Sequence, residues 1–216
     1  MLELYAILFG SYLVGSIPVA YIVVRNQAYV DIREKGSGNA GGYNAYVVTK
    51  SRLTGILVGV LDAGKGLAPV LAAGLLFPNS FLHGCLALIG AILGHNYPIW
   101  TGFKGGRGLS TSAGGMFLLG FSYTVVWCTI WVVTKYILKR DILVSNVTAI
   151  LSTPLLLWLL PWDWVSQLIV TNVESWTFAF FSCVLSIILL LSHLDAVNEI
   201  WKGPPKERPD ISTPHS

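Results

Sequence analysis

Long apolar segments that carry almost no charge divide this chain, and they limit its possible folds more than any other feature. Apolar residues make up 54% of the 216 residues and charged residues only 12%, whereas about 25% of residues are charged in an average soluble domain. Most of these segments are long enough to cross roughly 30 Å of hydrocarbon as a helix. The sequence therefore predicts an all-α integral membrane protein.

The positive residues between these segments predict how the helices are oriented. Cytoplasmic loops of membrane proteins are enriched in Lys and Arg, and all fourteen such residues can be placed on one side of the membrane or just inside it. No cation precedes the first segment and Arg25 follows it, which is typical of an uncleaved helix with its N-terminus outside. We expect seven transmembrane helices, with the N-terminus outside and the C-terminus cytoplasmic: 2–24, 53–77, 81–94, 109–121, 123–137, 142–160 and 176–191.

Two of these helices have unusual features. Pro18 is expected to bend the first one, because proline cannot donate a helical hydrogen bond. The fourth has only about thirteen residues, so it is either a short crossing or a re-entrant segment. Because Lys104 and Lys139 flank the fourth and fifth helices and both favour the cytoplasm, we expect it to cross. Residues 1–203 are expected to form one transmembrane domain, and residues 204–216 a polar cytoplasmic tail.

A glycine-rich segment, residues 36–44, lies on the predicted cytoplasmic side. Glycine lets backbone amides approach an anion closely, and Ser37, Asn39 and Asn44 add side-chain donors. Taken alone, such a segment is more often a flexible surface loop than a binding site. It becomes a candidate phosphate site only together with other segments.

A second polar segment, residues 95–111, is denser in groups that bind anions. It contains two cations, Lys104 and Arg107, and three glycines, and a predicted helix follows it directly. Helix N-termini attract phosphate through free amide hydrogens and the helix dipole. The Walker pattern is absent. The alternative is a positively charged cytoplasmic loop whose glycines serve packing.

Three further polar residues lie in or beside apolar segments. Asp62 and Lys65 are three residues apart and therefore share a helix face. A charge inside the membrane costs about 2.5–3.5 kcal/mol on insertion scales, so the pair either neutralises itself as a structural pair or has a function. His193 follows the last helix, where it could act as a base, as a phosphate donor or as an interfacial cap.

Composition and spacing exclude several classes. The net charge of +3 sits in loops beside apolar segments, so it gives no reason to expect nucleic-acid binding. The three cysteines lie in apolar segments, without the spacing of a C-x-x-C metal site. Phosphate binding would suit a carrier, a lipid head-group enzyme or a regulatory site. Apart from Asp62 and Lys65, the charged residues of the predicted helices lie near the helix ends, and no internal repeat is evident. A substrate site at the inner surface is therefore favoured over a transport path.

The order of the motifs resembles the bacterial acyl-phosphate:glycerol-3-phosphate acyltransferases of the PlsY type. The resemblance spans nearly the whole chain, and several motifs occur in one order at suitable spacing. They are Gly-Ser-Ile-Pro (15–18), Gly-Ser-Gly-Asn-x-Gly (36–41), Asp-x-x-Lys-Gly (62–66), Gly-His-x-x-Pro (94–98), Phe-Lys-Gly-Gly-Arg-Gly (103–108) and the terminal His193.

This resemblance implies a multi-pass enzyme of the bacterial inner membrane that uses neither a metal nor another cofactor. It would transfer a fatty acyl group from acyl-phosphate to the 1-hydroxyl of glycerol-3-phosphate, giving lysophosphatidic acid and phosphate. Its partners would be these two substrates and the lipid bilayer, with no nucleic acid, and we expect a monomer. The expected catalytic residues are Ser37, Lys104 and His193, and the expected substrate- and phosphate-binding residues are Gly38, Asn39, Asn44, His95, Gly105, Gly106, Arg107 and Gly108.

The chain departs from the family pattern at positions that the family uses around its polar substrate. Val47 stands where the family has Arg, and Ala196 where it has Asn. Lys50 or Arg52 could replace the missing Arg, and Asn198 the missing Asn. Two alternatives therefore stay open: an acyl-phosphate-dependent transferase with a different acceptor, and a phosphate or organophosphate carrier.

Overall fold

The computed structural model describes residues 1–170, 173–194 and 197–198, and all regular secondary structure in these ranges is helical. The predicted all-α class is therefore confirmed for the described residues. Two short 3₁₀ turns, η1 (Ile32–Glu34) and η2 (Ile99–Thr101), lie in loops, and the π-helical turn η3 (Val133–Ile137) extends α7. The α-helices are α1 (Leu2–Gly15), α2 (Val19–Ala28), α3 (Gly42–Thr49), α4 (Arg52–Leu76), α5 (Phe81–Asn96), α6 (Leu109–Leu119), α7 (Phe121–Val132), α8 (Ile142–Leu159), α9 (Trp162–Ser166) and α10 (Ser175–Leu191).

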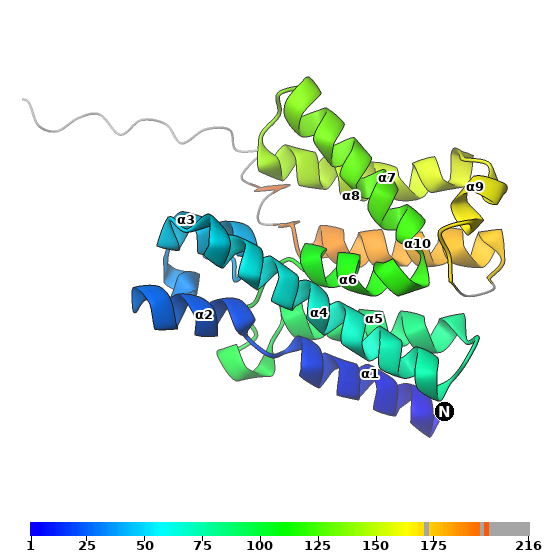
Figure 1. Cartoon of the computed structure of the whole chain (residues 1–216), viewed down its shortest axis with the longest axis horizontal. Helices are drawn as coiled ribbons and strands as arrows, with labels where there is room; N and C mark the ends of the chain where they lie inside the picture. Colours follow the sequence, from blue (N-terminus) through cyan, green and yellow to red (C-terminus); the bar gives the residue numbers. More distant parts are fainter. Residues whose placement is uncertain (171–172, 195–196, 199–216) are drawn as a thin grey trace, which may run out of the picture.

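The long helices run back and forth between two ends of the molecule (Figure 1). Helix α5 packs against α1 and α4, α6 packs against α4, and α8 packs against α7 and α10. Three apolar segments among the described residues are long enough to cross a membrane, namely 2–28, 52–76 and 142–159, whereas α6 and α10 are shorter. The count of seven crossings and the orientation of the termini stay predictions.

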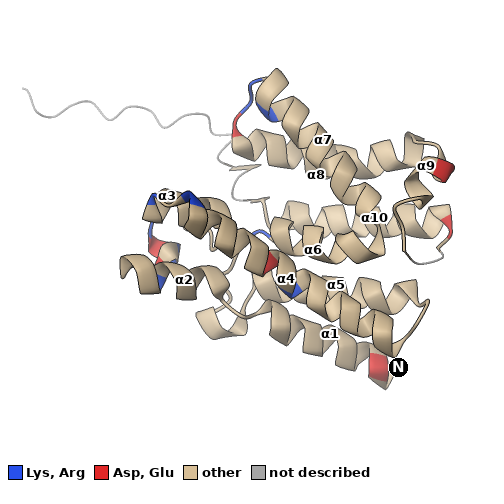
Figure 2. Cartoon of the chain, in the orientation of Figure 1, with Lys and Arg blue, Asp and Glu red and all other residues tan. Residues whose placement is uncertain are grey.

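The cations of the described loops lie at one end of the bundle, whereas acidic residues occur at both ends (Figure 2). Among the described residues, the loop cations gather at the end that holds α3, the loop before α6 and the α7–α8 turn. The opposite end carries Glu3, Asp163 and Glu174, and no described Lys or Arg. Loop cations favour the cytoplasmic face, and the orientation of the bundle in the membrane stays a prediction.

Small residues allow the helices to approach one another closely. A Cβ added to Gly15 of α1 would lie 2.1 Å from the carbonyl oxygen of Ala91 in α5. Between α4 and α6, a Cβ on Gly66 or Gly114 would lie 1.9 Å from a carbonyl oxygen of the facing helix. Small residues at such crossings are the usual means by which membrane helices gain van der Waals contact. This contact fixes the positions of the helices that carry the polar loops.

Pro18 interrupts the first helix instead of bending it. Helix α1 ends at Gly15 and α2 begins at Val19. Proline has no N–H to donate, and the Ile17 carbonyl instead accepts from the Val19 amide at 2.9 Å and from the Lys65 ammonium at 2.8 Å. The expected bend is therefore a break, and a charged side chain from α4 satisfies the carbonyl that the break leaves inside the bundle.

Helix α6, the predicted fourth crossing, has eleven residues, which rise only about 17 Å. The turn that follows it is enclosed by the chain. The Phe121 amide donates to the Leu168 carbonyl at 2.8 Å, and the Phe178 ring lies against Gly120. The segment after α9 thus covers this turn, so α6 does not need to span the full thickness of the hydrocarbon.

Candidate functional site

The polar segments that the sequence singled out meet at the cationic end of the bundle. The Ala40 amide donates to the Gly105 carbonyl at 3.2 Å, which joins the segment 36–44 to the loop before α6. The Ser192 hydroxyl donates to the Arg107 carbonyl at 2.9 Å, which joins the end of α10 to the same loop. The loop 95–108 is therefore the centre of the candidate site, with one neighbouring segment bonded to each end of its glycine run.

Asn44 holds the glycine-rich segment 36–44 in shape. Its buried side chain accepts a hydrogen bond from the Ser37 amide at 3.0 Å and donates to the carbonyls of Ile32 and Lys35 at 3.1 and 3.0 Å. Gly36 has φ +59°, a conformation that disfavours other residues. The segment is therefore a bonded loop that presents Ser37 on the surface. A contact between Asn44 and a substrate stays a prediction.

The glycines of the loop before α6 are required by close packing against α5. A Cβ on Gly105 would lie 2.1 Å from the His95 carbonyl oxygen, and one on Gly106 would lie 2.1 Å from Nε2 of the His95 ring. Gly108 has φ +78° and caps the N-terminus of α6. The loop therefore lies directly on α5 and leads into a helix N-terminus, the arrangement that binds anions through free amides.

The intramembrane pair Asp62 and Lys65 lies directly beneath this loop. The Lys65 ammonium is 3.0 Å from Asp62 Oδ1, 3.2 Å from Nδ1 of His95 and 2.8 Å from the Ile17 carbonyl oxygen. The ammonium thus forms an ion pair with Asp62 and hydrogen bonds with His95 and the Ile17 carbonyl. The pair is buried as a structural pair would be, and it also connects the break after α1 to α5 through His95.

A small cavity lies between the break after α1 and the loop before α6. Arg33 and Lys104 line it from the loops, and Lys65 and His95 line it from the helices. Ser37 and His193 are not part of its wall. Arg33 was not among the predicted site residues; the only signal for it in the sequence is its position four residues before Ser37.

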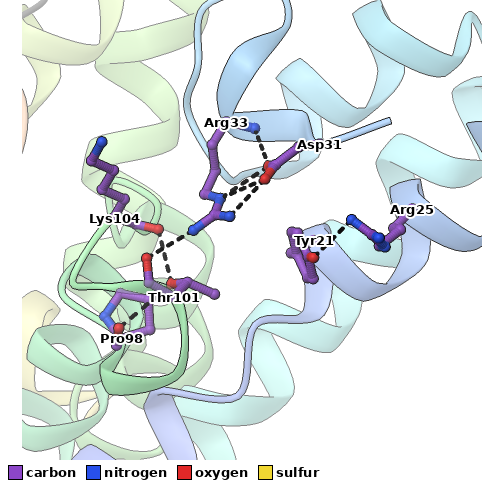
Figure 3. Close-up of polar contacts among 7 residues, drawn as sticks. All are labelled: Tyr21, Arg25, Asp31, Arg33, Pro98, Thr101 and Lys104. Atoms are coloured by element: carbon purple, nitrogen blue, oxygen red, sulfur yellow. Dashed lines mark hydrogen bonds and ion pairs between the residues drawn. The ribbon is translucent and has the colours of Figure 1, made fainter. Parts of the chain in front are cut away.

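Arg33 links the loop before Ser37 to the loop that carries Lys104 (Figure 3). Its guanidinium forms an ion pair with Asp31 at 2.6 Å and donates to the Thr101 carbonyl at 2.8 Å. The hydrogen bonds between the two side chains lower the pKa of Asp31 and raise the pKa of Arg33. The pair is therefore charged throughout the neutral range. The Lys104 side chain is exposed, and its ammonium has no partner among the residues that the structure describes.

His193 is fully buried just beyond α10. Its Nδ1 lies 2.7 Å from the Leu189 carbonyl oxygen, so this nitrogen carries the proton and donates. Nε2 is buried and has no partner among the described residues. Burial, with a smaller contribution from Arg107, lowers the pKa of His193 to about 4. At neutral pH the ring is therefore uncharged, with a free acceptor at Nε2.

The three expected catalytic residues thus lie on segments that are hydrogen-bonded to one another, and their side chains do not contact one another. Ser37 and Lys104 are exposed and His193 is buried. Ala196 lies outside the described residues. Within the described part of the chain, no three His, Cys, Asp or Glu side chains come together as a metal site would require. The arrangement offers cations, backbone amides and a neutral imidazole, which together suit a phosphate-bearing ligand.

A protein family, two related proteins and a solved structure each match this chain over most of its length. The family described as "Glycerol-3-phosphate acyltransferase" matches residues 5–203. The protein of that name from Mesorhizobium japonicum is 32% identical, and the match covers 92% of both chains. The one from Rhodopseudomonas palustris is 34% identical, and the match covers 89% of this chain and 90% of the relative. A crystal structure of PlsY (YgiH), an integral membrane glycerol 3-phosphate acyltransferase in its glycerol 3-phosphate form, superposes with a TM-score of 0.73 at 27% identity, covering 92% of each chain. The lysophosphatidic acid form gives a TM-score of 0.72 and covers 94% and 93%.

Proposed function

The chain belongs to the glycerol-3-phosphate acyltransferase family, and from this premise we propose that it acylates the 1-hydroxyl of glycerol-3-phosphate with acyl-phosphate as donor. The solved relative has been crystallised in a glycerol 3-phosphate form and in a lysophosphatidic acid form. These two ligands are the acceptor and the product of the proposed reaction. Acyl-phosphate is the donor that the motif pattern implies.

The reaction depends on the positioning of the two substrates more than on covalent catalysis by the protein. The glycerol hydroxyl oxygen forms a bond to the acyl carbon, the bond from that carbon to the phosphate oxygen breaks, and inorganic phosphate leaves. Acyl-phosphate is a mixed anhydride with a good leaving group, so no acyl-enzyme is required. The protein must hold two phosphates and one hydroxyl in line, and holding reactants in this way can supply several kcal/mol of the barrier reduction.

Lys104 and the loop after it are the proposed phosphate-binding groups. The Lys104 ammonium is exposed and unpartnered among the described residues, and it directly precedes the Gly105–Gly108 run at the N-terminus of α6. Charge-assisted bonds from an ammonium and free amides are the strong contacts for a phosphate. Ser37, presented by the loop bonded to Gly105 through Ala40, is proposed to contact the polar substrate from the other side.

The proton of the attacking hydroxyl is proposed to pass to a substrate phosphate. A phosphate monoester has a second pKa of about 6, whereas burial lowers the pKa of His193 to about 4. The phosphate dianion is therefore the stronger base of the two. His193 would accept a hydrogen bond at Nε2 and orient the hydroxyl, which requires only the free lone pair at that atom.

One observation carries this proposal: the family match over residues 5–203 includes all three segments that the fold joins by hydrogen bonds. The test is release of phosphate from acyl-phosphate by the protein purified in detergent, with and without glycerol-3-phosphate, together with detection of lysophosphatidic acid. Acceptor-dependent release is expected, and Lys104→Ala should lose most of it. Release no faster than in that variant would reject the proposal.

A different acceptor is the second candidate, and one observation favours it. Val47 on α3 is exposed at the position where the family pattern has Arg, and neither Lys50 nor Arg52 lines the cavity. A panel of phosphorylated polyols with the same donor separates the two candidates. Faster turnover with another polyol phosphate would favour the second, and activity confined to glycerol-3-phosphate would remove it.

We also propose seven crossings with the N-terminus outside, a place in the bacterial inner membrane, and a monomeric state. The gathering of the described loop cations at one end of the bundle supports the orientation (Figure 2). Thiol labelling of single cysteines placed at Lys35 and Asp163 in intact cells tests it. Labelling of the first site from outside would contradict the proposed orientation.

A further inference from the structure

The turn that leads into Lys104 has a conformation that its own residues do not favour. It runs from Pro98 to Lys104, and the amides of Thr101 and Phe103 both donate to the Pro98 carbonyl, at 3.2 and 3.0 Å. Gly102 and Phe103 have φ values of +63° and +62°. The left-handed region is uncommon for a residue with a side chain, and it costs free energy that the surroundings must supply. Contacts from outside the turn are therefore needed to hold it.

Thr101 is the residue through which the turn is held. Its hydroxyl donates to the Lys104 carbonyl at 3.0 Å, and its own carbonyl accepts from Nη1 of Arg33 at 2.8 Å. Thr101 is only 9% exposed, so water competes little for these bonds. Figure 3 shows the guanidinium of Arg33 between Asp31 on one side and the turn on the other.

Two neighbours orient the Arg33 guanidinium toward this turn. Asp31 accepts from Nε at 2.9 Å and from Nη2 at 2.6 Å. The ring of Tyr21 lies under the guanidinium, with 5.0 Å between the ring centroid and Cζ. A planar guanidinium that is paired at two nitrogens and stacked on a ring keeps few other orientations. Its third nitrogen is therefore directed at the Thr101 carbonyl.

Lys104 is fixed through its backbone while its ammonium stays available. Thr101 binds the Lys104 carbonyl, and the next carbonyl, that of Gly105, accepts from the Ala40 amide. We propose that Arg33 is a positioning residue, which fixes the Pro98–Lys104 turn and thereby places the Lys104 ammonium beside the phosphate of a substrate on the glycine loop. This inference rests on the proposed function.

Direct binding of phosphate by Arg33 is the competing explanation, because Arg33 lines the cavity. All three nitrogens of its guanidinium already donate to protein oxygens, two to Asp31 and one to Thr101. A phosphate would have to compete with the Asp31 pair. The two explanations differ in one measurable respect: a positioning residue acts through Lys104, whereas a phosphate ligand acts independently of it.

The kinetic test compares Arg33→Ala with the matched control Arg25→Ala. Arg25 also lies over the Tyr21 ring, at 5.6 Å, and donates to the Tyr21 hydroxyl, but among the described residues it makes no hydrogen bond to the turn. Arg33→Ala should lower kcat/KM about tenfold, mainly by raising the KM of a phosphate-bearing substrate, and Arg25→Ala should leave kcat/KM unchanged. In a Lys104→Arg background, Arg33→Ala should cost less than about twofold further. Costs that multiply, or an unchanged kcat/KM in Arg33→Ala, would overturn the proposal.

Thr101 supplies a second test that leaves every charge in place. Thr101→Val removes the hydroxyl and should reproduce the rise in KM, whereas Thr101→Ser keeps the hydroxyl and should restore the wild-type value. Melting temperatures in detergent show whether each variant is folded. Wild-type KM in a folded Thr101→Val would count against a positioning role for this chain of contacts.

Hydrogen exchange tests the inference without any turnover. Measured by mass spectrometry on peptides covering 98–106, the amides of Thr101 and Phe103 should exchange faster in Arg33→Ala than in the wild type or in Arg25→Ala. Unchanged exchange would refute the inference even where activity falls, because Arg33 would then act on the substrate directly. If the wild type does not turn over these substrates, the proposed function fails, and the exchange result by itself decides whether Arg33 holds the turn.

Discussion

Replacing Lys65 with Met should destabilise this protein more than the removal of any exposed lysine. The side chain is 7% exposed, and its ammonium is surrounded by Asp62, His95 and the Ile17 carbonyl. Methionine has a similar length but no charge and no donor. The substitution therefore leaves the Asp62 carboxylate, which is 2% exposed, without the Lys65 cation. It also leaves the Ile17 carbonyl at the helix break with only the Val19 amide as a donor.

The expected magnitude follows from the partners that are left behind. Removing one member of a buried ion pair costs about 3–5 kcal/mol, because the remaining charge is uncompensated. Removing both charges avoids this penalty. In the double variant Asp62→Leu/Lys65→Met the main remaining cost is the lost hydrogen bond from Lys65 to the Ile17 carbonyl, about 1.5–3 kcal/mol, and that carbonyl keeps its bond from the Val19 amide. The double variant should therefore be more stable than the single variant, although it carries one more substitution.

Denaturant unfolding in mixed micelles, followed by tryptophan fluorescence, measures this order. The control is Lys35→Met, which removes an exposed lysine of the same end of the bundle and should change the stability by less than about 0.5 kcal/mol. A Lys65→Met protein as stable as the wild type would refute the reasoning, since the ammonium would then contribute nothing to the fold. A double variant less stable than the single one would refute the argument from the uncompensated charge.

Three shorter predictions concern the loops and the packing. Gly106→Ala places a methyl group 2.1 Å from His95 Nε2 and 2.9 Å from the Ala40 carbonyl oxygen, so kcat/KM should fall at least about tenfold; wild-type kinetics in a folded variant would show that the loop can move without loss. Gly66→Ala brings a Cβ within 1.9 Å of the Thr111 carbonyl oxygen, and the forced separation of α4 and α6 should lower the free energy of unfolding by about 1–3 kcal/mol, which thermal or denaturant melting in detergent checks. Burial lowers the pKa of His193 to about 4 in the folded protein, against an ordinary value of 6.5. Between these pH values the unfolded chain binds a proton that the native protein does not. The free energy of unfolding should therefore fall as the pH is lowered from about 6.5 to 4. His193→Gln should remove that part of the slope, and melting curves recorded from pH 4 to pH 8 that keep the same slope would contradict the assignment.

The positions of the main helices were predictable because hydropathy is a local property. Helix α4 was expected at 53–77 and occurs at Arg52–Leu76, and α8 was expected at 142–160 and occurs at Ile142–Leu159. Each segment is apolar enough that lipid or the bundle interior is its only favourable surrounding, and a helix satisfies its backbone there. The break at Pro18 was predicted only as a bend, because the partner that stabilises a break lies 48 residues away, on Lys65.

The polar residues of the site were largely recognisable from the sequence, but their roles were not. The phosphate-binding pattern around Lys104 and the resemblance to a family both follow from neighbouring residues in the chain. By contrast, Asp62 and Lys65 were identified as a pair without their third member, His95, which is 30 residues from Lys65. Arg33 was missed as a site residue, because its contact with Thr101 spans 68 residues.

By itself the sequence determined a helical membrane protein with its loop cations at one end, and the family to which it belongs. Both conclusions depend on the kind and order of residues along the chain. Only the tertiary structure decided that Lys65 satisfies a broken helix, that Arg33 holds the turn before Lys104, and that Ser192 joins the last helix to the glycine loop. These contacts exist because glycines bring the helix backbones close enough for side chains of distant segments to meet, and that distance is a property of the packed bundle.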